Sequence, residues 1–128
     1  MRKDHELITG LSHTIEEIVT KDKSAISMGS GTLEVYATPS MISLMEKTSM
    51  LCVEQYLNDD ESTVGGAVNI KHLKPTALGQ MVKCKSVIKE VKGIKIEFEL
   101  EVHEGEKLIG VGSHIRFIIN KTAFMDNL

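Results

Sequence analysis

Residues 36–57, YATPSMISLMEKTSMLCVEQYL, contain the clearest helical pattern in the chain. Thr38 suits the N-cap of this helix, and Pro39 suits the first helical position, where its missing N–H costs nothing. One broad and mainly apolar sector of the helical wheel contains Met41, Leu44, Met45, Thr48, Leu51 and Cys52, with Ile42 and Val53 widening one side. The pattern therefore predicts a largely buried helix.

Four extended stretches follow this helix, at residues 64–72, 80–91, 94–103 and 107–119. The third alternates strictly between apolar and charged residues in IKIEFELEV, residues 94–102, as a strand with one covered face requires. Gly93 and Gly105 lie in the short joints that follow the second and third stretches, and glycine permits tight hairpins. The last three stretches are therefore expected to form an antiparallel meander.

The segments before the helix carry weaker signals. Residues 11–20, LSHTIEEIVT, predict a lead-in strand, and the cluster of Gly29, Ser30 and Gly31 predicts a loop, whereas residues 1–10 are polar and without a pattern. One long apolar helix with such a meander packs best if the curved sheet wraps around the helix. The expected fold is α+β, a hotdog fold with a long central helix inside an antiparallel sheet.

Composition limits the kinds of partner. The 128 residues are enough for one core but too few for two ordinary domains, so residues 1–128 are expected to form a single domain. With 15 basic and 18 acidic residues and a net charge of -3, the chain has no basic field for nucleic acid. It also lacks a run of about 18 apolar residues that would span a membrane. We expect neither partner.

Cysteine and histidine usage indicates the compartment and argues against a metal. Cys52 and Cys84 have neither the density of a disulfide scaffold nor the close spacing of a zinc site, which favours a reducing, cytoplasmic setting. The histidines are scattered without a metal-ligand spacing, so no metal is predicted.

Three polar residues stand out from this background. Thr38, Glu46 and His72 offer a hydroxyl, a carboxylate and an imidazole, the groups needed to activate a nucleophile or a water against an ester or thioester. Glu46 falls at the apolar border of the helix, where desolvation would raise its basicity; the alternative is a carboxylate paired with lysine or reaching solvent. The predicted cap explains Thr38, and a surface position explains His72, equally well.

Geometry raises a question about this set. Eight residues of helix place Thr38 and Glu46 about 12 Å apart, too far for direct contact. Either the first turn is irregular, the substrate bridges the two groups, or a partner subunit completes the site. The sequence leaves these three options open.

The segments YATPSMISLMEKTS, VGGAVNIKHLKPTALGQMV and LIGVGSHIRFII resemble the fluoroacetyl-CoA thioesterase family of hotdog proteins. The family has a Thr before its central helix, a Glu eight residues later and a His 26 residues beyond, and Thr38, Glu46 and His72 match these positions. The resemblance also implies that Gly65 lies near the acyl group and that Arg116 lies at the site. It further implies coenzyme A thioesters as substrates, no other cofactor, and a dimer with active sites near the interface.

Other residues admit two interpretations. Gly65 and Gly66 predict either a bend of the sheet or room for a small acyl group with backbone N–H groups free to meet its oxygen. Arg116 suits an acyl or phosphate group, or else a cross-strand ion pair with a glutamate. His114 shares the strand face of Arg116 and is expected to support it. Lys71 and Lys74 are expected either to meet nucleotide phosphates or to be ordinary surface lysines.

One departure from the family concerns the acyl group. The specialised fluoroacetate enzyme carries phenylalanines shortly before its threonine, whereas this chain has MGSGTLEVYA, residues 28–37, without phenylalanine. We therefore expect a different or more general small acyl-CoA as substrate.

The combined prediction is a homodimeric thioesterase that hydrolyses a small acyl-CoA to the acid and coenzyme A. Glu46, with His72, would activate a water or the Thr38 hydroxyl, and backbone N–H groups near Gly65 or the helix N-terminus would stabilise the oxyanion. The alternatives are a noncatalytic acyl-CoA binding module and a hotdog dehydratase, whose usual Asp and His arrangement is not visible.

Overall fold

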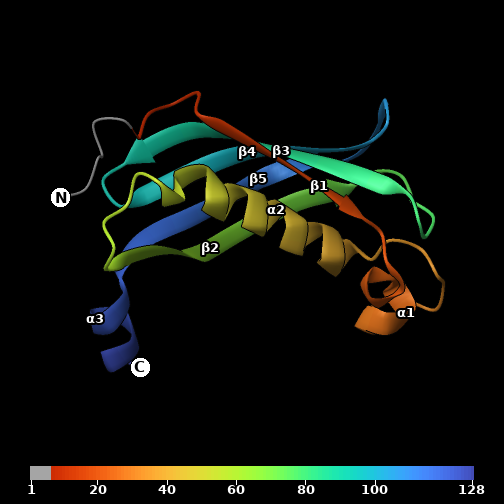
Figure 1. Ribbon diagram of the computed structural model, residues 1–128, viewed down its shortest axis with the longest axis horizontal. Helices are drawn as coiled ribbons and strands as arrows, with labels where there is room; N and C mark the ends of the chain where they lie inside the picture. The colour runs from red at the N-terminus through yellow and green to blue at the C-terminus, as the bar shows by residue number, and fades with distance from the viewer. Residues whose placement is uncertain (1–6) are drawn as a thin grey trace.

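A long helix, α2, lies across one face of a curved antiparallel sheet in the computed structural model, which describes residues 7–128 (Figure 1). The elements in chain order are β1 Ser12–Ile18, a 3-10 turn Lys21–Lys23, α1 Ala25–Met28, α2 Thr38–Glu54, β2 Glu61–His72, β3 Met81–Lys92, β4 Lys95–Glu104, β5 Lys107–Asn120 and α3 Lys121–Asp126. The predicted α+β architecture is confirmed.

The strand order β1-β3-β4-β5-β2 contains the predicted meander of β3, β4 and β5. Gly93 and Gly105 adopt φ angles of 61° and 59° in the two hairpins, a left-handed conformation that favours glycine. The predicted lead-in strand is β1, which pairs with β3. The strand β2 pairs with β5 alone, so one edge of β2 has no neighbouring strand within residues 7–128.

Apolar and charged residues alternate along β4, and its apolar face lies in the core as predicted. Ile96, Phe98, Leu100 and Val102 are buried against the helix side, whereas Ile94 lies just before the strand and is 52% exposed. The core contains two apolar clusters, one around Met41, Met45 and Val102 and one around Val53, Ile88 and Ile118. Buried polar side chains also lie within the molecule: Thr48, Ser49, Thr63, Ser86, His114 and Arg116.

The helix buries most of its predicted sector, but two details differ. Leu51 is only half-buried, while Ser40 and Ser49 are buried because their hydroxyls have partners: Ser40 donates to the Lys23 carbonyl and Ser49 lies 2.8 Å from the Ser86 hydroxyl. Hydrogen bonding removes the cost of burying a serine. The helical wheel predicted burial from apolar character alone, so it did not predict that Ser40 and Ser49 are buried.

The prediction that Thr38 caps α2 is wrong. Ala37 occupies the N-cap with an extended backbone, no side chain caps the first turn, and Thr38 is the first helical residue. Other boundaries also differ: β2 begins at Glu61 rather than Val64, and α1 and α3 were not predicted. Leu7, in the segment expected to lack a pattern, is 3% exposed and packs in the core, while residues 1–6 lie outside the described residues.

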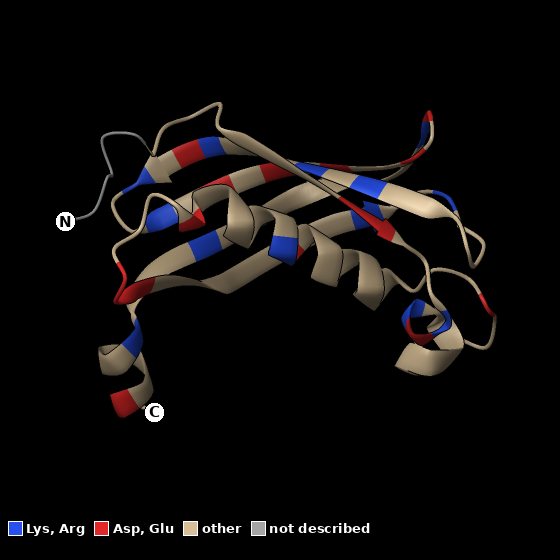
Figure 2. Ribbon diagram, in the orientation of Figure 1, with Lys and Arg blue, Asp and Glu red and all other residues tan. Residues whose placement is uncertain are grey.

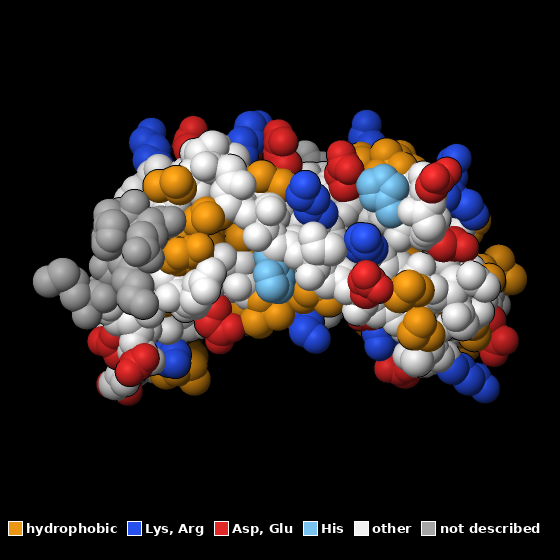
Figure 3. All heavy atoms as spheres, turned by 45° about the horizontal axis from the view of Figure 1, so that its top comes forward, with side chains coloured by type: hydrophobic (Ala, Val, Ile, Leu, Met, Phe, Trp, Pro, Cys, Tyr) orange, Lys and Arg blue, Asp and Glu red, His pale blue; other side chains and the backbone are white. Residues whose placement is uncertain are grey.

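Charges of both signs are interspersed along the sheet and helices (Figure 2), as the mixed sequence predicted. On the face shown in Figure 3, charged side chains of both signs surround scattered hydrophobic ones. No single-sign surface is therefore visible on that face.

Among residues 7–128, none of the helices has the length and apolar character needed to cross a membrane.

Candidate active site

The start of α2 meets the end of β2 at Thr38 and His72. The Thr38 hydroxyl oxygen lies 2.7 Å from Nδ1 of His72, a hydrogen bond between residues 34 positions apart. Thr38 is exposed and His72 is half-buried, so the pair sits at the surface with the imidazole behind the hydroxyl. This arrangement can polarise the hydroxyl if Nδ1 accepts its proton.

One tautomer of neutral His72 allows that direction of the bond. Its Nε2 is buried and has no close hydrogen-bond partner among the described residues, although the Lys74 backbone partly stabilises the protonated ring. With the proton on Nε2, Nδ1 is free to accept from Thr38. Burial is the larger effect and lowers the pKa of His72, so the ring is neutral near pH 7.

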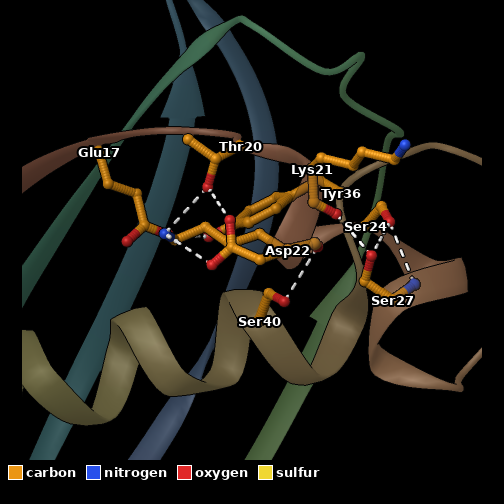
Figure 4. Close-up of polar contacts among 9 residues, drawn as sticks. Glu17, Thr20, Lys21, Asp22, Ser24, Ser27, Tyr36 and Ser40 are labelled. Atoms are coloured by element: carbon orange, nitrogen blue, oxygen red, sulfur yellow. Dashed lines mark hydrogen bonds and ion pairs between the residues drawn. The ribbon is translucent and has the colours of Figure 1, made fainter.

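Tyr36 holds the ring of His72 from the side. The two rings meet edge to face with centroids 6.3 Å apart, and Tyr36 is 2% exposed. The Tyr36 hydroxyl donates to the Glu17 carboxylate at 2.9 Å, and Figure 4 shows this contact beside that of Ser40 near the start of α2. Burial and Glu17 raise the pKa of Tyr36 well above its ordinary range, so the phenol remains a donor.

A pocket of about 330 Å³ opens beside the Thr38–His72 pair. Its walls combine small and apolar residues with one cation, namely Ala25, Ser30, Val35, Tyr36, Ala37, Leu73, Lys74 and Pro75. Lys71, by contrast, lines a separate hollow with Lys85, Glu99 and Glu101. Of the two candidate phosphate lysines, only Lys74 borders the pocket at His72.

Glu46 lies at a second position, over the middle of β2. A Cβ added to Gly65 would lie 3.0 Å from Oε2 of Glu46 and 3.3 Å from the ring of His114, so glycine leaves room for the carboxylate. Nη1 of Arg116 would lie 3.7 Å from the same added Cβ. Glu46 is half-buried, which agrees with the predicted apolar border.

Arg116 is buried and firmly held. Its Nε donates to the Thr63 hydroxyl at 2.8 Å, its Nη2 donates to the Thr63 carbonyl at 2.9 Å, and its Nη1 lies 3.1 Å from Nε2 of His114. Burial lowers the pKa of the guanidinium and Glu46 opposes that shift. Arginine nevertheless stays protonated, so it supplies a fixed positive charge near Glu46.

The two adjacent glycines meet different requirements. The register of β2 against β5 shifts between Gly65 and Ala67, which makes Gly66 the extra residue of a bulge. A Cβ on Gly66 would lie 2.4 Å from the Phe117 ring, whereas Gly65 faces Glu46. The predicted bend is present, and Gly65 alone borders the carboxylate.

The sequence-predicted residues thus form two groups within one chain. Thr38 joins His72 at one end of β2, and Glu46 joins Gly65 and Arg116 near the bulge. Two neighbours were missed: Tyr36, because a ring contact across 36 positions leaves no local pattern, and Thr63, because its bond to Arg116 depends on the β2–β5 register.

The cysteines are poor nucleophiles. Both are buried, and burial raises the pKa of Cys52 and of Cys84 to about 11. The thiolate is the reactive form, so both are largely inert at neutral pH. Within residues 7–128, no three His, Cys, Asp or Glu side chains gather as a metal site would require.

Comparisons with known proteins agree on one family. The family described as fluoroacetyl-CoA-specific thioesterase matches residues 19–122. The fluoroacetyl-CoA thioesterase of Streptantibioticus cattleyicolor is 31% identical over 91 residues, which cover 71% of this chain and 66% of that protein. The matched region therefore spans slightly less than two thirds of this relative.

Solved structures give the same result. A fluoroacetyl-CoA thioesterase superposes with a TM-score of 0.89 at 25% identity, covering 94% of this chain and 93% of its own. A thioesterase superfamily member from Thermus thermophilus reaches 0.87 at 24% identity, covering 94% and 89%. A hot-dog-like protein from Thermanaerovibrio acidaminovorans reaches 0.85 at 14% identity, covering 93% and 88%. The last two structures are less than 25% identical to this chain and support the fold alone.

These likenesses confirm the predicted hotdog fold and the predicted enzyme class, a thioester hydrolase, and they favour hydrolysis over the noncatalytic binding module. The chain belongs to the fluoroacetyl-CoA-specific thioesterase family of hotdog proteins.

Proposed function

We propose that this protein hydrolyses a small acyl-CoA to the free acid and coenzyme A, at a site formed by Thr38, His72 and Glu46. The hydrogen bond between Thr38 and His72 is the observation that carries the proposal, because it pairs a hydroxyl with a neutral imidazole at the mouth of a pocket. Membership in a thioesterase family supports the thioester as substrate.

The chemistry follows from the groups present. On one route, His72 takes the Thr38 proton as the Thr38 oxygen attacks the thioester carbonyl; the C–S bond then breaks, coenzyme A leaves as the thiol with the proton from His72, and water hydrolyses the acyl-Thr38 ester. On the other route, Thr38 orients a water that attacks the carbonyl directly, and the C–S bond breaks to release the acid and the coenzyme A thiol. The Glu46 carboxylate acts as the base toward that water. The first N–H groups of α2 have no partner within the helix and lie at its positive end, so they suit the developing oxyanion.

A second copy of the chain brings Glu46 to the Thr38–His72 pair. The free edge of β2 is exposed from Gly65 to Asn69, and Val68 is 40% exposed. Antiparallel pairing of two such edges about an axis midway between Gly65 and His72 sets the Glu46 region of one protomer beside Thr38 of the other. In such a homodimer, Thr38 and Glu46 of the same helix, which are about 12 Å apart, do not have to contact each other.

The remaining parts of the substrate have suitable neighbours. The small residues Ala25, Ser30 and Ala37 line the pocket and leave space for an acyl or pantetheine chain, and Lys74 at its border suits a phosphate. Gly65 and Arg116 lie beside Glu46, where they would meet the acyl group or its carboxylate product. The substrate supplies the coenzyme A, and no other cofactor is required.

We further assign the protein to a reducing compartment, the cytoplasm. Both cysteines are free and buried, which suits a setting where thiols stay reduced.

Hydrolysis of acetyl-, propionyl- and longer acyl-CoA thioesters by wild type and by Glu46→Gln tests the function. Thiol release by wild type, with a large loss in Glu46→Gln, supports it. Tight binding without turnover by wild type would favour the binding module, and equal rates in the two proteins would remove Glu46 from the mechanism. Hydration of an enoyl-CoA would indicate a dehydratase instead.

A further inference from the structure

His114 connects the bulge of β2 with Arg116. Its side chain is 1% exposed, its Nδ1 lies 2.7 Å from the Ala67 carbonyl oxygen, and its Nε2 lies 3.1 Å from Nη1 of Arg116. A carbonyl only accepts and a guanidinium only donates. Both bonds therefore exist together only when Nδ1 carries the proton, Nε2 carries none, and the ring is neutral.

This bond completes the anchoring of Arg116. Thr63 fixes the guanidinium through Nε and Nη2, and His114 fixes the remaining nitrogen, Nη1. Nη1 is also the nitrogen that approaches the space over Gly65, where Oε2 of Glu46 lies. His114 thus adds a third hydrogen bond, at the guanidinium nitrogen that faces the same space over Gly65 as the carboxylate.

Every element packed against His114 affects its protonation. Arg116 from β5 and burial favour the neutral ring, while Glu46 from α2 and the Ala67 carbonyl from β2 favour the charged one; burial is the largest effect, and the pKa of His114 is lowered. The Phe98 ring of β4 stacks on the imidazole with centroids 6.1 Å apart and adds no charge. A protonated ring would turn an N–H toward Arg116, and that bond would break.

We propose that His114 is a positioning residue whose neutral form accepts a hydrogen bond from Nη1 of Arg116 and so steadies that end of the guanidinium beside Glu46, a bond that is lost when the ring is protonated. The inference rests on the proposed function, because Glu46 is the group whose surroundings it controls. His114 touches neither substrate nor reacting atoms in this account and acts through Arg116.

Two substitutions separate the two bonds of His114. In His114→Gln the longer side chain can place an amide oxygen near the Nε2 position and accept from Arg116. In His114→Asn the amide reaches only the Nδ1 position, so the bond to Ala67 is kept and the bond to Arg116 is lost. His103→Asn, a half-buried histidine of β4 away from Arg116, is the matched control.

The measurement is kcat and KM for a small acyl-CoA between pH 5 and 8. At pH 8 we expect His114→Asn to lower kcat by roughly 10- to 100-fold, the effect of losing one hydrogen bond to a charged group, with little change in KM. His114→Gln should keep most of the activity and lose less of it on acidification than wild type. In an Arg116→Lys background, His114→Asn should lower kcat little further, because the two residues act together.

Equal activity of His114→Asn and His114→Gln, or an undiminished effect of His114→Asn in the Arg116→Lys background, would overturn the proposal. If His114→Asn does not fold, the Gln variant decides. A loss of activity on acidification identical to that of wild type would refute the positioning role of His114. Wild-type turnover separates the two hypotheses, since its absence refutes the proposed function, whereas turnover without any effect at His114 refutes only this inference.

Discussion

The Thr38 hydroxyl and Nδ1 of His72 lie 2.7 Å apart, although they come from the start of a helix and the end of a strand 34 residues later. Thr38 is the first residue inside the helix rather than its cap, and its hydroxyl contacts His72. This contact joins two of the three groups that we propose for thioester hydrolysis. The third, Glu46, lies along the same helix but over the middle of β2.

Replacing Thr38 should affect activity far more than stability. Thr38 is exposed and caps nothing, but Thr38→Val removes its hydrogen bond to His72, so the free energy of unfolding should fall by only about 0.5–1.5 kcal/mol. Loss of the polarised hydroxyl should lower kcat/KM by about 100-fold or more, with partial retention in Thr38→Ser. Urea unfolding and steady-state kinetics check this, and a Thr38→Val enzyme with wild-type kcat/KM would exclude the hydroxyl.

Activity should fall on the acid side with an apparent pKa below the ordinary histidine value of about 6.5. Burial lowers the pKa of His72, so the ring stays a proton acceptor to lower pH and loses that role only when it is protonated. Protonation of His114, whose pKa burial also lowers, should add to the same fall. A profile of kcat/KM from pH 4.5 to 8 measures the midpoint of this fall in activity. A midpoint well above 6.5 would show that a different group controls it.

Acidification should also destabilise the fold. The pKa values of His72 and His114 are lowered by burial, so below about pH 6.5 the unfolded chain binds more protons than the folded one. The stability is fully present above that pH and is lost as pH falls toward the folded pKa values. Urea unfolding at pH 7.5 and 5.5 should give a smaller free energy at pH 5.5, and equal values would contradict the burial of both rings.

Alanine at the two adjacent glycines should produce different defects. A Cβ at Gly65 presses on the Glu46 carboxylate at 3.0 Å, so Gly65→Ala should lower kcat with modest loss of stability. A Cβ at Gly66 overlaps the Phe117 ring at 2.4 Å, so Gly66→Ala should cost about 1–3 kcal/mol of unfolding free energy. Thermal unfolding with kinetics compares the two, and a reversed order of effects would contradict the assigned neighbours.

Much of the fold was predictable because its signals are local. The alternation from Ile94 to Val102 and the glycines of both hairpins determine β4 and its neighbours, and the apolar sector from Met41 to Cys52 determines the buried face of α2. The short helix α1 was not predictable in this way, because it depends on local capping: the Ser24 side chain accepts from the Ser27 N–H and Gly29 ends the helix at a φ of 70°.

The sequence supplied candidate residues for the site but not the contacts among them. The resemblance identified Thr38, Glu46 and His72, but whether Thr38 would bind the helix or His72 depends on where β2 ends. The bond from Arg116 to Thr63 likewise requires the β2–β5 register, including its bulge. Neither is encoded in spacing along the chain.

Complementation between two inactive variants tests most directly whether the thioesterase site is shared between protomers. In a heterodimer of Thr38→Ala and Glu46→Gln, one site carries both substitutions and the other carries neither. Because random mixing makes half of the dimers heterodimers, unfolding and refolding the two variants together should restore about one quarter of wild-type hydrolysis of a small acyl-CoA. A mixture no more active than the separate variants, once heterodimers are verified by mass, would contradict the shared site.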